Sequence, residues 1–171
     1  TLISNILRFG LLFISGVVIA RALGPEDYGN FGFLLGSFTA LANLVDMASS
    51  SAFYTFISQK KRGQKFYYYY TIWIFTQFTI LLFFVLLLPA PLKEKIWLGH
   101  PRRMILLALF ASFSMRQIWE FVGRIGESIR DTVSVQIRNV TLALTYLTCI
   151  ILLVRFHLVS IKFFFIANGL I

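Results

Sequence analysis

The stretch Arg21-Ala22-Leu23-Gly24-Pro25-Glu26-Asp27-Tyr28-Gly29 is the first polar interruption in a very apolar chain. Apolar residues dominate from Leu2 to Ala20 before it and from Phe31 to Ile57 after it. Gly24 can adopt the left-handed conformation that ends a helix, and the proline that follows disfavours continuation of that helix. Pro25 in turn suits the first position of a new helix. The stretch therefore predicts the turn of a helical hairpin.

The composition indicates an all-α, multi-pass membrane protein. Of the 171 residues, 58% are hydrophobic and only 13% are charged, and the mean hydropathy is +0.78. Soluble domains carry about 25% charged residues. The net charge of +9 does not favour nucleic-acid binding, because the basic residues lie at the ends of apolar runs, as membrane flanks do. With a single cysteine, Cys149, the chain has no thiolate spacing for a metal site.

The apolar runs predict five complete transmembrane helices and the start of a sixth. Their expected positions are about 2–22, 26–57, 68–88, 104–123, 138–154 and 163–171. The last run is shorter than the ~20 residues that cross a bilayer, so we expect 1–171 to be part of an N-terminal bundle in a longer protein. Positive charge is densest at Lys60, Lys61, Arg62 and Lys65, which predicts a cytoplasmic loop there and a cytoplasmic N-terminus.

Arg8 is the notable polar residue of the first predicted helix. It shares one helix face with Asn5 and Ser15. An arginine at mid-bilayer costs at least ~2.5–3.5 kcal/mol unless it is paired or hydrated. Arg8 therefore either reaches the interface along its own side chain or faces a protein-lined, hydrated site.

A polar and small-residue stripe follows one face of the second predicted helix. It alternates steps of three and four residues: Gly29, Gly32, Gly36, Thr39, Asn43, Asp46 and Ser50. Small residues allow close helix packing, whereas Asn43, Asp46 and Ser50 could line a substrate path. Both interpretations remain open at this point.

Arg8 and Asp46 are expected at a similar depth. Arg8 lies 16 residues before Gly24, and Asp46 lies 18 residues after Tyr28. On antiparallel helices these positions come level, so we hypothesise that the two side chains can pair.

Arg116 and Gln117 lie in the second half of the fourth predicted helix, where Arg116 can also pair with Glu120 four residues on. On the fifth, Thr141, Thr145 and Thr148 form a face suited to helix packing.

The turn also resembles the signature of a transporter family. The polysaccharide transporters, which are flippases for lipid-linked oligosaccharides, carry Ala-Arg-x-Leu-Gly-Pro-Glu-x-Tyr/Phe-Gly between their first two helices. Here the pattern is met by Arg21, Leu23, Gly24, Pro25, Glu26, Tyr28 and Gly29. The small residues from Asp46 to Phe53 also fit the family. The specific part of the resemblance lies within the first two predicted helices.

The resemblance implies the N-terminal six-helix bundle of a 12–14-helix transporter of the multidrug/oligosaccharidyl-lipid/polysaccharide exporter superfamily. Its implied activity, without a catalytic site or a cofactor, is movement of an undecaprenyl-pyrophosphate-linked oligosaccharide, such as an O-antigen unit, across the bacterial inner membrane. Coupling to H⁺ or Na⁺ remains open. The implied partners are membrane lipids and the polysaccharide polymerase and chain-length machinery.

Side-chain chemistry selects candidate substrate-binding residues within such a transporter. Arginine binds phosphate oxygens through a rigid fork of donors, which makes Arg8 the first candidate for the pyrophosphate and Arg116 the second. Amide, hydroxyl or carboxylate groups could contact sugar or carry ion coupling, at Asn43, Asp46, Ser50 and Gln117.

Three other functions compete with the flippase. A cation-coupled multidrug exporter would need acidic residues in its cavity, and only Asp46 is an acid expected at mid-membrane. A membrane-embedded glycosyltransferase is disfavoured, since the seven acidic residues are scattered without metal or paired-carboxylate spacing. A non-transporting scaffold would have Arg8 and Asp46 paired and dry.

Overall fold

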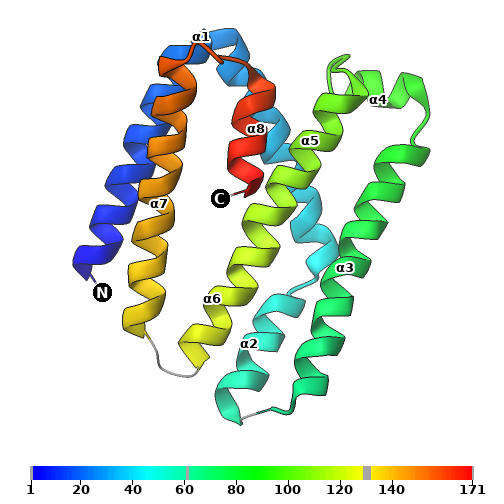
Figure 1. Cartoon of the computed structure of the whole chain (residues 1–171). Coiled ribbons are helices and arrows are strands. Elements are labelled where there is room, and N and C mark those ends of the chain that lie inside the picture. The colour runs from blue at the N-terminus through cyan, green and yellow to red at the C-terminus, as the bar shows by residue number, and fades with distance from the viewer. Residues whose placement is uncertain (1, 61, 129–131, 171) are drawn as a thin grey trace.

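The computed structural model describes residues 2–60, 62–128 and 132–170, apart from the side chains at 118–120, 128, 132 and 170. The elements are α1 (Leu2–Asp46), α2 (Ser49–Gln59), α3 (Gln64–Leu87), α4 (Ala90–Ile96), α5 (Arg102–Phe113), the π-helical turn η1 (Ser114–Ile118), α6 (Trp119–Ser128), α7 (Thr132–Arg155) and α8 (Ile161–Leu170). The described residues thus contain helices and no strand (Figure 1). Lys61 of the predicted basic loop and Ile171 of the last predicted helix lie outside the described residues.

Four helical stretches of the described chain are long and apolar enough to cross a membrane. They cover Leu2–Asp46, Gln64–Leu87, Arg102–Glu127 and Val133–Arg155. Their outer faces are apolar: on the first stretch an exposed stripe runs through Leu2, Ile6, Phe9, Phe13 and Val17, with Phe13 73% exposed. Soluble monomers rarely expose apolar surfaces this continuous. The structure therefore supports a multi-pass membrane protein.

Gly24 bends α1 into two arms that run in opposite directions (Figure 1). The sequence-based prediction of a turn at this glycine is confirmed. Its φ of 77° is positive as expected, but its ψ of 171° is extended rather than left-handed helical. This combination is essentially restricted to glycine. Pro25 follows directly and begins the second arm without needing a backbone donor.

Gly24→Ala is expected to lower the free energy of unfolding by about 1–3 kcal/mol, because a Cβ strains this backbone conformation. Gly16→Ala is the matched control. Gly16 lies in regular helix on the same element, and no described atom comes within 4 Å of the position its Cβ would take. That change should be neutral or stabilising by up to about 1 kcal/mol. Thermal unfolding of the purified full-length protein measures both, and equal shifts for the two variants would contradict the strain at Gly24.

The helix predicted over 26–57 is divided at Met47 and Ala48, which have φ of 45° and 60°. The Asp46 carboxylate accepts hydrogen bonds from the backbone N–H of Ser50 at 3.3 Å and from its hydroxyl at 2.8 Å. A carboxylate is favoured at the N-terminus of a helix, where backbone donors lack partners. Asp46 therefore stabilises the start of α2, and the continuous helix expected here is wrong.

Other helix boundaries also differ from the sequence-based ranges. The expected loop over 89–103 contains α4, which starts after Pro89 with a proline in its first turn. Trp97, at its end, is fully buried and stacks on Phe38 with ring centroids 5.5 Å apart.

The expected helix over 104–123 is interrupted by η1, where the Ser114 hydroxyl donates to the Gly169 carbonyl of α8 at 2.8 Å. α7 starts at Thr132 rather than near 138, while residues 129–131 of the expected connector lie outside the described residues.

The connections sort to the two ends of the bundle. The N-terminal end of α1, the α2–α3 connection and the facing ends of α6 and α7 lie at one end (Figure 1). The bend at Gly24, α4 and the start of α8 lie at the other. The predicted basic loop at 60–65 and the N-terminal end of α1 therefore lie at the same end of the bundle.

The second arm of α1 is packed against α5 and α8. Phe31 contacts Phe165 of α8 with ring centroids 4.9 Å apart, and the Ser112 hydroxyl of α5 donates to the Leu35 carbonyl at 3.5 Å. The first arm of α1 lies beside α7 (Figure 1). Polar side chains from these elements meet in the space that remains between the two arms.

Candidate functional site

A cavity of about 650 Å³ lies between the two arms of α1, the α5–α6 stretch and α7. We call it the arginine cavity because three of its lining residues are arginines. It is lined by Arg8, Leu35, Thr39, Ser112, Met115, Arg116, Gly123, Arg124, Glu127, Val135 and Asn139. Glu127 is the one acidic residue among these described lining residues. The cavity thus combines an excess of positive charge with hydroxyl and amide groups.

Arg8 and Arg116 reach this cavity from different elements. Arg8 comes from the first arm of α1, with its guanidinium 5.8 Å from the Phe9 ring centroid. Arg116 comes from η1, and single π-helical turns are often found at functional sites. Within the described residues neither side chain has a hydrogen bond or an ion pair. Both guanidinium groups therefore carry donors that no described residue accepts.

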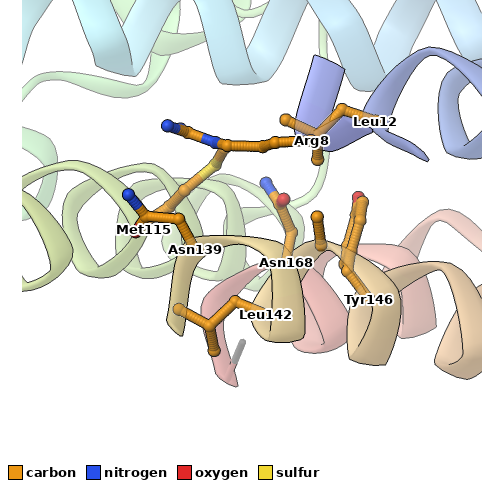
Figure 2. A pocket seen from close by; sticks show the side chains of 8 residues that line it. Arg8, Leu12, Met115, Asn139, Leu142, Tyr146 and Asn168 are labelled. Atoms are coloured by element: carbon orange, nitrogen blue, oxygen red, sulfur yellow. The ribbon is translucent and has the colours of Figure 1, made fainter. Parts of the chain in front are cut away.

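A smaller pocket of about 120 Å³ adjoins the arginine cavity (Figure 2). We call it the amide pocket because two asparagines line it. Its lining residues are Arg8, Leu12, Met115, Asn139, Leu142, Ala143, Tyr146 and Asn168. Arg8, Met115 and Asn139 border both spaces. Figure 2 shows that the side chains of Asn168 and Tyr146 point toward Arg8.

The Asp46 carboxylate is the centre of a buried hydrogen-bond network at the α1–α2 break. It accepts from the Ser49 hydroxyl at 2.7 Å, the Ser50 hydroxyl at 2.8 Å and the Gln77 amide at 3.4 Å. The side-chain oxygen Oε1 of Gln77 in turn accepts from the side-chain amide of Gln117 of η1 at 3.2 Å. Trp73 donates to Ser49 at 2.8 Å. The network joins α1, α2, α3 and η1.

Arg124 connects this network to the arginine cavity. It lines the cavity from α6, and its Nη1 donates to the Ser50 carbonyl oxygen at 2.6 Å. Ser50 also donates to Asp46. A change in the cavity that moves Arg124 would therefore act on the start of α2.

The structure separates the six predicted substrate-binding residues into groups. Arg8 and Arg116 line the arginine cavity. Asp46, Ser50 and Gln117 belong to the buried network, and Asn43 is exposed on α1 outside both spaces. The hypothesised pairing of Arg8 with Asp46 is not observed among the described residues, because Asp46 is bonded to Ser49, Ser50 and Gln77. The side chain of Glu120, the other expected partner of Arg116, lies outside the described residues.

The predicted stripe on the second arm of α1 is also divided. Thr39 lines the arginine cavity, and Asp46 and Ser50 are buried in the network. At Gly32 and Gly36 no atom of the described residues lies within 4 Å of the position a Cβ would take. The glycine part of the stripe therefore packs against no other described helix.

Several lining residues were not selected from the sequence, among them Arg124, Asn139, Tyr146 and Asn168. Asn139, Leu142, Ala143 and Tyr146 do follow the helical spacing of three and four residues, which was a usable signal. The sequence instead favoured Thr141, Thr145 and Thr148. In the structure these hydroxyls are exposed and donate to carbonyls four residues earlier on α7.

No group of three His, Cys, Asp or Glu side chains within the described residues could hold a metal ion. No family model matches the chain, and no curated protein or solved structure matches it.

Proposed function

We propose that this chain belongs to a flippase that moves an undecaprenyl-pyrophosphate-linked oligosaccharide across the bacterial inner membrane by alternating access. The observation that carries the proposal is the arginine cavity. Its lining holds Arg8, Arg116 and Arg124 against a single acid, Glu127. A lipid-linked pyrophosphate is doubly anionic, and guanidinium forks bind phosphate oxygens through paired, charge-assisted hydrogen bonds.

The remaining chemistry of the cavity suits the glycan part of this substrate. Thr39 and Ser112 offer hydroxyls and Asn139 offers a carboxamide. Such groups can exchange hydrogen bonds with sugar hydroxyls. The lipid tail needs no protein site, because it can remain in the bilayer beside the exposed apolar faces of the helices. The turn signature from Arg21 to Gly29 supports the same function through its resemblance to the flippase family.

The finer architecture belongs to this proposal. With each arm of α1 taken as one span, α3, the α5–α6 stretch and α7 complete five transmembrane helices, and α8 begins a sixth. The chain is then most of the N-terminal bundle of a 12–14-helix transporter. The N-terminus and the α2–α3 connection face the cytoplasm, and the cavity would face the second bundle.

Two alternatives are less well supported by the cavity. A cationic drug, the substrate of a multidrug exporter, would be repelled by the three arginines of the cavity. Two of these arginines have no partner in the described residues. A scaffold without transport has no need for a cavity lined by arginines at membrane depth, where they are costly.

Reconstituted vesicles of the full-length protein test the proposal. The probe is a fluorescent polyprenyl-diphospho-oligosaccharide, and movement to the outer leaflet is detected by its capture with a glycan-binding lectin. We expect capture to exceed that of protein-free vesicles, under an imposed H⁺ or Na⁺ gradient if coupling is required. Efflux of a lipophilic cationic dye without movement of the lipid would favour the exporter, and movement of neither would favour the scaffold.

A further inference from the structure

Asn168 places an unused donor in the amide pocket. The residue is 6% exposed, and its Nδ2 is buried without a hydrogen-bond partner among the described residues. In Figure 2 its carboxamide points into the space bordered by Arg8 and Tyr146. Buried amide groups nearly always have a partner, and one without a partner calls for an explanation. A ligand that brings an acceptor oxygen would supply it.

The size of the pocket limits that ligand. A volume of about 120 Å³ corresponds to the share of roughly four water molecules in the liquid. It therefore fits a substituent of a few heavy atoms. The walls at Leu12, Leu142 and Ala143 are apolar and suit a methyl group. An acetamido group has this size and chemistry: a carbonyl acceptor, an N–H donor and a methyl.

The position of the pocket limits the ligand further. Arg8 and Asn139 line both the amide pocket and the arginine cavity, so the two ligand groups lie side by side. In a 2-acetamido sugar attached through its anomeric carbon to a pyrophosphate, the acetamido group and the phosphate are on neighbouring carbons. A pocket for the first group must then adjoin the site for the second.

We propose that the amide pocket binds the 2-acetamido group of the sugar linked directly to the pyrophosphate. This inference rests on the proposed flippase function. The Nδ2 of Asn168 donates to the acetamido carbonyl, and the methyl lies against Leu142 and Ala143. The pocket thereby selects substrates whose first sugar is N-acetylated, whatever glycan follows.

Two matched lipids test this selection on the purified full-length protein. One is polyprenyl-diphospho-N-acetylglucosamine and the other is polyprenyl-diphospho-glucose, which has a hydroxyl in place of the acetamido group. We expect the wild type to bind the first about tenfold more tightly, since one hydrogen bond and one buried methyl distinguish them. Asn168→Ala should lower the ratio to about threefold, which the methyl contact alone supports, with little change for the glucose lipid. The ratio is taken within one protein, so a general loss of folded material cancels.

Thr145→Ala is the control, because Thr145 is exposed on α7 next to Tyr146 and borders neither space. It should keep the wild-type ratio. A wild-type ratio within twofold of one, or a tenfold preference that survives in Asn168→Ala, would overturn the acetamido site. If both lipids bind equally well and far better than the uncharged polyprenol, the flippase proposal stands without it. If neither binds better than polyprenol, the proposed function itself fails.

Discussion

Asp46→Ala is expected to lower the free energy of unfolding of the full-length protein by about 2–3 kcal/mol. The wild-type carboxylate is 7% exposed and accepts from Ser49, Ser50 and Gln77. Removing it takes the acceptor from the Ser49 and Ser50 hydroxyls, although Gln77 keeps the Ser49 hydroxyl oxygen at 3.1 Å, and takes the negative charge from the start of α2. Thermal unfolding in detergent, followed by tryptophan fluorescence, measures the change, since Trp73 donates to Ser49 in the same network.

Asp46→Asn should cost less, about 1 kcal/mol, because the amide keeps one acceptor oxygen in the same place. Asn43→Ala is the control for stability. Asn43 lies three residues earlier on α1 and is exposed, so its replacement should change stability by no more than about 0.5 kcal/mol. If Asp46→Ala unfolds at the wild-type temperature, the network does not hold the α1–α2 break.

The turn at Gly24 could be predicted because its cause is local. Pro25 disfavours helical backbone at Gly24, the residue directly before it, and this effect does not depend on the rest of the chain. The break at Met47 and Ala48 depends instead on partners distant in sequence, such as Gln77 of α3. The local signal for this break was Asp46 with serines from Ser49 onward, since such polar residues are common at helix starts. The hydropathy of the segment nevertheless favoured one continuous helix.

The candidate site was only partly predictable for the same reason. The sequence selected Arg8 and Arg116 because a guanidinium binds phosphate oxygens, and Arg8 also because an arginine inside a membrane is costly. It could not show that both line one cavity, because η1 changes the direction of the side chains after Ser114. Arg8 and Asp46 were expected at a similar depth along their helices, but depth alone does not determine which side chains meet. Gln77 and the α2 serines provide the partners of Asp46 instead.

The link through Arg124 gives the two parts of the site a physical connection. Its guanidinium lines the arginine cavity while it donates to the Ser50 carbonyl at the start of α2. An anion in the cavity would compete with Ser50 for the same donors. Substrate binding would then weaken a contact that holds α2 against α6. Under the proposed alternating access, substrate binding has to change contacts between helices, and this contact between α2 and α6 is one that it can change.

Arg8→Ala and Arg116→Ala are each expected to reduce translocation of a polyprenyl-diphospho-oligosaccharide by about 10- to 100-fold. A charge-assisted hydrogen bond contributes about 1.5–3 kcal/mol, and each 1.4 kcal/mol is a factor of ten. Arg8→Lys should show an intermediate loss, since lysine keeps the charge but lacks the planar fork of donors. The double variant should lose more than either single one, and initial rates of lectin capture in vesicles measure all four.

Arg103→Ala is the matched control for these arginines. Arg103 is exposed at the start of α5 and lines neither the arginine cavity nor the amide pocket, so its loss should leave the rate within about twofold of the wild type. Equal binding of the diphosphate lipid by the wild type and by the Arg8/Arg116 double variant would remove both residues from substrate recognition. The cavity would then have to bind something other than a pyrophosphate, because its remaining described charges, Arg124 and Glu127, nearly cancel.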